Sequence, residues 1–171
     1  MNFKNHGNEL HAQRTYHDAI QAYTSGLEAG PTDPDIRVSL LNNRAACNLA
    51  LKNHRAVLRD TGVIIALSST EGKEPPLKAM YRAAQSLVAL ERWDEARDVV
   101  YRGRQCKGED QAWVVLGDQV EKGQRREVEK IERERRETLR KQALWRAVQV
   151  CLRIFTATEQ LIGLVSRVGR D

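Results

Sequence analysis

The sequence has 171 residues, of which 41% are apolar and 30% are charged, with a formal net charge of +5. This length and apolar content suit one packed domain with an extension. The three cysteines form no CxxC pair, which argues against a disulfide framework or a zinc site. No run of about 18 apolar residues occurs, so we expect no membrane contact and a location in the cytoplasm or the nucleus.

The positive charge is concentrated in one part of the chain. Residues 124–146 hold nine Lys or Arg and five Glu, and this surplus of four accounts for almost all of the net charge. The first 123 residues are therefore close to neutral. Any cationic site among them must depend on where individual side chains lie.

The first part of the chain contains three similar helix–turn–helix units, in stretches rich in good helix formers. They run from about Asn2 to Leu27, from about Asp35 to Leu67 and from about Pro76 to Cys106. Small residues recur at equivalent positions, offset by roughly 35 to 40 residues, which lets paired helices approach closely. These positions are Gly7, Ala45 and Ala84 in the first helices, and Ala19, Val57 and Ala96 in the second helices.

The spacing of these units resembles the 34-residue tetratricopeptide repeat (TPR), and the resemblance covers residues 3 to about 107. It implies an all-α fold in which three TPR helical hairpins form a right-handed superhelix. An ordinary helical bundle is the alternative.

The pattern changes after Gly108. Residues 111–150 are predicted to form one or two long helices, and their start is apolar at helical spacing (Trp113, Val114, Leu116 and Val120). We expect residues 108–123 to be a capping helix on a TPR domain at 1–107, because an open repeat end needs a cap. Residues 124–150 are predicted to be an extended charged helix with i,i+4 pairs, followed by a segment at 151–171 of unknown role.

Five polar side chains lie on the first helices of the repeats, which line the inner groove of a TPR superhelix. Lys4 with Asn8, and Lys78 with Arg82, are i,i+4 pairs that share a helix face, and Asn43 comes from the second repeat. The set has three cations, two amides and no acid. Such a site suits a ligand with two neighbouring carboxylates, as a C-terminal Asp has.

The strings Phe3–Asn8, Asn42–Ala46 and Lys78–Arg82 resemble the two-carboxylate clamp of TPR co-chaperones, which bind the EEVD tails of heat shock protein 90 and heat shock protein 70. The resemblance implies that Lys4, Asn8 and Asn43 hold the terminal carboxylate. It also implies that Lys78 meets the Asp side chain, and that Arg82 reaches the peptide backbone or an upstream Glu. The stretches 43–55 and 57–60 are similar to the tetratricopeptide repeat protein 4 family, which includes a fungal co-chaperone of heat shock protein 90.

Two features depart from that family. Its members usually have a long segment before the first repeat and a further domain after the long helix, so we expect this chain to be a shortened form. His11 occupies a groove position where the family often has an apolar or aromatic residue.

Other chemistries are less well supported by the sequence. No catalytic grouping, metal-ligand set or phosphate-binding loop occurs, so we expect a non-enzymatic protein without a cofactor. Interleaved glutamates argue against nucleic-acid binding by the Arg-rich helix. Residues 139–155 form a basic amphipathic stretch that offers an alternative binding surface for an unrelated partner, although docking within the protein's own fold is the simpler interpretation.

Overall fold

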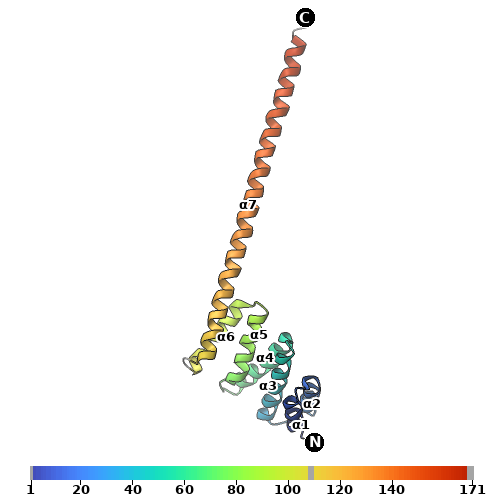
Figure 1. The fold of residues 1–171 in the computed structure, drawn as a ribbon, viewed down its shortest axis with the longest axis vertical. Helices are drawn as coiled ribbons and strands as arrows, with labels where there is room; N and C mark the ends of the chain where they lie inside the picture. The colour runs from blue at the N-terminus through green and yellow to red at the C-terminus, as the bar shows by residue number, and fades with distance from the viewer. Residues whose placement is uncertain (1, 108–109, 169–171) are drawn as a thin grey trace. The chain divides into compact units, whose positions relative to one another are not determined.

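The computed structural model describes residues 2–107 and 110–168. These ranges contain seven helices and no strand, as the sequence predicts (Figure 1). The helices are α1 (Phe3–Ala12), α2 (Tyr16–Glu28), α3 (Pro34–Ala50), α4 (His54–Thr70), α5 (Leu77–Ala89), α6 (Trp93–Lys107) and α7 (Gln111–Val168). The chain divides into a unit at residues 1–124 and a second unit at residues 125–171, and each is considered by itself.

Side-chain caps mark the starts of α1 and α3. The Asn2 side chain accepts a hydrogen bond from the backbone of Asn5, at 3.3 Å, in the first turn of α1. Asp33 caps α3 in the same way at 2.8 Å, and Pro34 follows at a position where its missing N–H costs nothing. These local signals explain why α1 and α3 start within a residue or two of the predicted starts of the first two units, near Asn2 and Asp35.

The turn inside each hairpin has the same backbone conformation. One residue in each turn has a positive φ, near +60°, although none of the three is glycine; they are Arg14, Lys52 and Glu91. The residue that follows each of them donates its N–H to a carbonyl five positions earlier, at 2.8–3.0 Å. This is the Schellman ending of a helix, repeated three times. The links between hairpins place Gly30 and Gly72 in the left-handed region instead.

The small residues predicted to separate paired helices are buried. Ala19, Val57 and Ala96 are each 0% exposed, as are Ala45 and Ala84. Gly7 is buried too, and a Cβ added there would fall on the ring of Tyr23. These positions therefore set how closely the two helices of each hairpin approach.

The start of α7 packs against the third hairpin. Trp113, Leu116 and Val120 are 2–4% exposed and share a cluster with residues of α5 and α6. The Trp113 ring also meets the edge of Tyr81, with centroids 5.2 Å apart. The apolar face that the third hairpin would otherwise expose is therefore covered.

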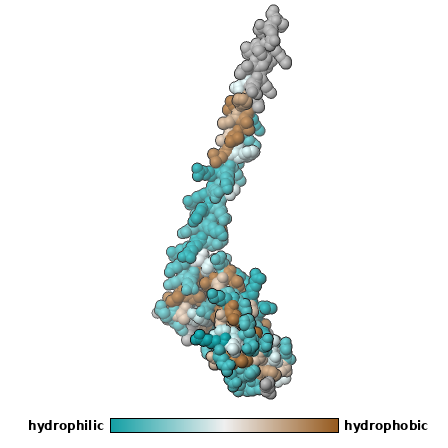
Figure 2. Space-filling model, turned by 45° about the vertical axis from the view of Figure 1, so that its right-hand side comes forward, coloured by the Kyte–Doolittle hydropathy of each residue, from teal (hydrophilic) through white to brown (hydrophobic). Residues whose placement is uncertain are grey.

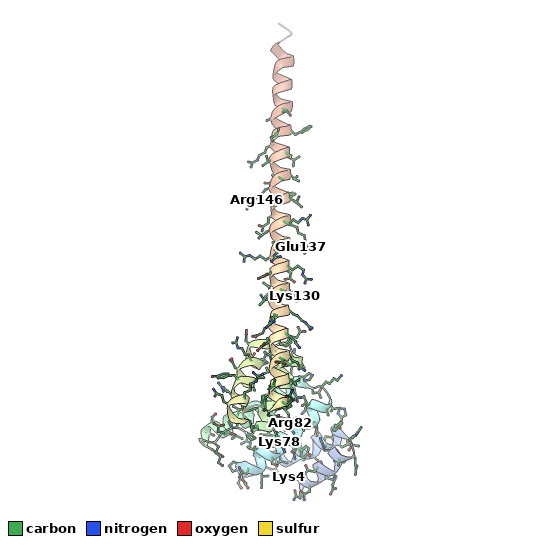
Figure 3. The ribbon with its side chains drawn as sticks, turned by 60° about the vertical axis from the view of Figure 1, so that its left-hand side comes forward. Lys4, Lys78, Arg82, Lys130, Glu137 and Arg146 are labelled. Atoms are coloured by element: carbon green, nitrogen blue, oxygen red, sulfur yellow. The ribbon has the colours of Figure 1, made fainter. Side chains whose placement is uncertain are left out.

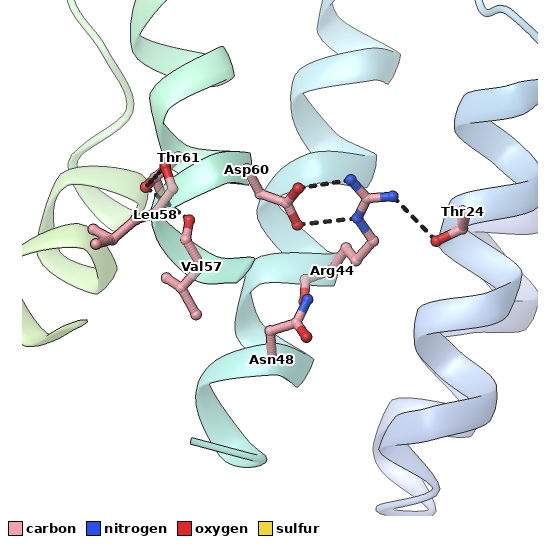
Figure 4. A network of polar contacts seen from close by, with 7 residues as sticks. All are labelled: Thr24, Arg44, Asn48, Val57, Leu58, Asp60 and Thr61. Carbon is pink, nitrogen blue, oxygen red and sulfur yellow. Dashed lines mark hydrogen bonds and ion pairs between the residues drawn. The ribbon is translucent and has the colours of Figure 1, made fainter. Parts of the chain in front are cut away.

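A buried ion pair ties three consecutive helices together (Figure 4). Arg44 of α3 donates two hydrogen bonds to Asp60 of α4, at 3.0 and 2.6 Å, and a third to Thr24 of α2, at 3.1 Å. The Asp60 side chain is only 7% exposed. The bidentate pair joins the two helices of the second repeat, and the bond to Thr24 ties them to the first repeat.

The second unit begins within α7. Its charged part carries i,i+4 ion pairs, with Arg136 to Glu132 at 3.4 Å and Lys141 to Glu137 at 2.8 Å, as the sequence predicts. The sequence assigned no structure to residues 151–171, but the helix continues to Val168. Within the described residues, no helix combines the length and the apolar character needed to cross a membrane.

Candidate functional site

Two of the predicted site residues contact each other across neighbouring repeats. Asn43 of α3 donates its side-chain N–H to Asn8 Oδ1 of α1, at 2.9 Å. The same oxygen accepts the hydroxyl of Tyr23 of α2, at 2.8 Å. Because Asn8 Oδ1 receives both donors, the orientation of its amide is fixed, and its Nδ2 is left to donate elsewhere.

The third repeat contacts α3 through Arg82. Its guanidinium donates to the side-chain oxygen of Asn42, the residue next to Asn43 on α3. Lys78 lies one turn earlier on α5, is exposed, and borders the same pocket as Arg82 (Figure 3). The structure therefore joins Asn8 to Asn43 directly, whereas Arg82 contacts the residue beside Asn43.

Lys4 is less closely tied to the site. It is exposed on α1, one turn before Asn8, and thus on the same helix face. No contact joins it to Asn43 or to the α5 cations among the described hydrogen bonds and ion pairs. Its membership of the site still rests on the sequence.

The groups beneath these side chains are neutral. Burial raises the pKa of Tyr23 to about 12 and the pKa of the Cys47 thiol to about 11. Burial also lowers the pKa of Arg82 from its usual value. The phenol and thiol carry no negative charge near neutral pH, so they do not compensate the cations of the site.

A pocket of about 380 Å³ lies beside Lys78 and Arg82. Its apolar walls come from α3, α5 and the start of α7, and the remaining lining is polar. The lining residues are Leu49, Leu77, Lys78, Tyr81, Arg82, Gln85, Asp110, Ala112 and Trp113. Asp110 accepts the backbone N–H of Ala112, at 3.0 Å, and so caps α7 at the edge of the pocket.

Sequence reasoning missed Tyr23 and Asn42 as members of the site. Tyr23 lies on α2, a second helix, and so falls outside the lining expected of the groove. Asn42 stands beside Asn43, and the doubled amide was an available signal. The pocket residues Tyr81 and Gln85 follow Lys78 at i+3 and i+7, so the sequence also predicts that they share its helix face.

The cysteine and histidine side chains form no metal site among the residues that the structure describes. Cys47 is 0% exposed and belongs to the core. His11 packs edge-on against Tyr16, with ring centroids 5.5 Å apart. Among the residues that the structure describes, no three His, Cys, Asp or Glu side chains gather in a way that could hold a metal ion.

Comparison with known proteins identifies the relatives of this chain. No protein-family model matches it. It is 38% identical over 122 residues to the Hsp70/Hsp90 co-chaperone cns1 of Schizosaccharomyces pombe, an alignment that covers 71% of this chain and 33% of that protein. It is 28% identical over 151 residues to human tetratricopeptide repeat protein 4, covering 86% of this chain and 38% of that protein. The chain thus spans 33% and 38% of the lengths of these two relatives.

Solved structures agree with this assignment. The Hsp90 co-chaperone Cns1 of Saccharomyces cerevisiae matches with a TM-score of 0.69 and 27% identity, over 82% of this chain and 44% of that one. The first TPR domain of Spaghetti (RPAP3), solved with the HSP90 peptide SRMEEVD, matches with a TM-score of 0.60 and 25% identity, over 70% of this chain and 88% of that one. In sequence and in fold, the chain is a TPR protein that resembles the Cns1 co-chaperones and tetratricopeptide repeat protein 4.

Proposed function

We propose that this chain is a non-catalytic co-chaperone adaptor that binds the C-terminal EEVD peptide of heat shock protein 90, heat shock protein 70 or both. Residues 1–107 form the peptide-binding domain and residues 108–123 cap it. The charged helix at 124–150 and the segment at 151–171 extend from it. We place this adaptor in the cytoplasm or the nucleus.

The observation that carries this proposal is the hydrogen bond between Asn43 and Asn8, two amides 35 positions apart on different repeats. It supports a groove shared by side chains whose proximity the sequence could infer only from their equivalent positions in the repeats. With the Asn8 oxygen occupied, its Nδ2 is available to donate to a carboxylate. Each charge-assisted hydrogen bond of this kind contributes about 1.5–3 kcal/mol.

In the proposed complex, Lys4, Asn8 and Asn43 hold the terminal carboxylate, and Lys78 meets the side chain of the C-terminal Asp. Arg82 uses one of its five donors on Asn42, which leaves others for the peptide. The pocket beside Lys78 and Arg82 has apolar walls and suits an apolar side chain upstream of the acidic residues.

The relatives support the same function. Two of the matching proteins are named as Hsp70/Hsp90 co-chaperones, and a structural neighbour was solved with a peptide that ends in EEVD and has Met directly before it. That Met is an apolar residue of the kind that the pocket suits.

The first experiment measures fluorescence anisotropy of a labelled EEVD-ending peptide and of its C-terminally amidated form. The clamp requires the free carboxylate, so the amidated peptide should bind at least about tenfold more weakly. Equal affinity for both peptides would overturn the proposal.

The second experiment changes the charge of the site. Lys78→Glu replaces an attractive contact by a repulsive one and should weaken binding by about thirtyfold or more, with an unchanged circular dichroism spectrum. Lys122→Glu is the matched control, because Lys122 is an exposed helical lysine outside the site and should leave the dissociation constant unaltered. Equal affinities of the two variants would show that Lys78 is only a surface residue.

A further inference from the structure

Residues 138–155 of α7 present an unusual amount of apolar surface for a single helix (Figure 2). Eight apolar side chains in this stretch are each 47–64% exposed. They are Leu139, Leu144, Trp145, Val148, Val150, Leu152, Ile154 and Phe155. Contiguous apolar patches of this kind mark sites of interaction.

The charge of this stretch differs from that of the helix before it. Residues 125–137 hold six cations and five acids, and they are linked by ion pairs such as Arg136 to Glu132. Residues 138–155 hold four cations and no acid. A second copy of this stretch would repel the first, whereas an acidic surface would attract it.

The apolar side chains surround more than half of the helix. Leu144, Val148, Leu152 and Phe155 follow one another at helical spacing on one face. Trp145 flanks this face on one side, and Val150 and Ile154 flank it on the other. At 100° per residue, the apolar arc covers roughly 220°.

The width of this apolar arc indicates whether the helix binds in a protein groove or on a flat lipid surface. A helix that lies on a lipid surface buries about half of its circumference, with cations along the remainder. A helix held in a protein groove is enclosed on three sides. Arg146 and Arg153, seven residues apart, share the narrow strip that the apolar arc leaves, where acidic groups at the rim of a groove would meet them. Arg140 and Lys141 point within the arc, but they precede Leu144 and so lie at its N-terminal end.

We propose that residues 139–155 dock into a groove of another protein that is lined by apolar side chains and rimmed by acidic ones. This surface is separate from the clamp of the TPR domain, and its partner is of a different kind from a chaperone tail. The clamp binds two carboxylates, whereas this helix offers apolar side chains with two cations on the opposite strip and two at its N-terminal end.

Calcium-loaded calmodulin is a suitable probe, since it presents an apolar groove with acidic surroundings and closes it when calcium is removed. Isothermal titration with the full chain should show binding with a dissociation constant of about 1 µM or tighter, lost on adding a calcium chelator. Trp145→Ala with Leu152→Ala should weaken it by about thirtyfold. Alanine keeps the helix propensity high, so the circular dichroism spectrum should not change.

The matched control is Val128→Ala with Ile131→Ala, which removes two equally exposed apolar side chains (56% and 55%) from the near-neutral part of the helix. It should bind like the wild type, and so should Lys78→Glu, which separates this surface from the clamp. Absence of calmodulin binding, or equal loss in both double variants, overturns the proposal. Binding only to anionic vesicles, or self-association that Trp145→Ala abolishes, overturns it in favour of a membrane or a second copy.

Discussion

Tyr23→Phe tests whether the fold positions the clamp. The hydroxyl of Tyr23 lies under the groove and donates to Asn8 Oδ1, while Asn43 donates to the same atom. A flipped Asn8 amide would break both of these hydrogen bonds, since its N–H groups would then face the Asn43 N–H and the Tyr23 hydroxyl. Removing the hydroxyl leaves only one bond to disfavour that flip, with no change in the packing of the ring.

The expected size of the effect follows from one neutral hydrogen bond, which contributes about 0.5–1.5 kcal/mol net. Tyr23→Phe should therefore weaken binding of the EEVD-ending peptide by about two- to twelvefold. Asn8→Ala removes a donor to the carboxylate itself and should weaken binding by about twelvefold or more. Anisotropy with the labelled peptide measures both.

The pH dependence provides an internal check. Burial raises the pKa of Tyr23 to about 12, so its hydroxyl remains protonated and able to donate between pH 7 and 9. The affinity ratio of wild type to Tyr23→Phe should be constant over that range. If Tyr23→Phe binds like the wild type while Asn8→Ala does not, Tyr23 only packs against Gly7 and the positioning argument is refuted.

Three further predictions concern stability, all measured by denaturant unfolding. Asp60→Ala should lower the free energy of unfolding by about 3 kcal/mol. This is the lower end for a broken buried ion pair, because the Arg44 side chain is 22% exposed. A loss below about 1 kcal/mol would mean that water replaces the carboxylate as the partner of Arg44. Lys52→Gly should raise the free energy of unfolding by about 0.5 kcal/mol, because glycine adopts the positive φ of 59° without strain. The greater entropy that glycine gives the unfolded chain reduces this gain. A destabilised variant would contradict this reasoning. The free energy of unfolding should fall as the pH rises from about 9 towards 11, because the Cys47 thiol ionises in the unfolded chain while its pKa in the folded protein is about 11. An equally steep fall in a Cys47→Ala variant would argue against this cause.

The sequence by itself determined the repeats and their boundaries. Helical periodicity, caps such as Asp33 and small residues at recurring positions are local signals, and each acts within a few residues of the chain. For the same reason it placed Asn8, Asn43 and Arg82 on the first helices of their repeats. The contact between Asn43 and Asn8 agrees with that placement, whereas the position of Lys4 in the site stays a prediction.

The tertiary structure decided which side chains meet. The hydroxyl of Tyr23 reaches Asn8 across 15 positions, Arg82 reaches Asn42 across 40, and Arg44 joins Asp60 and Thr24. These pairings depend on how neighbouring hairpins are rotated and spaced, and periodicity does not encode that. The positive φ at Lys52 was hidden for a related reason: the hairpin requires a left-handed residue there, and contacts elsewhere offset its strain.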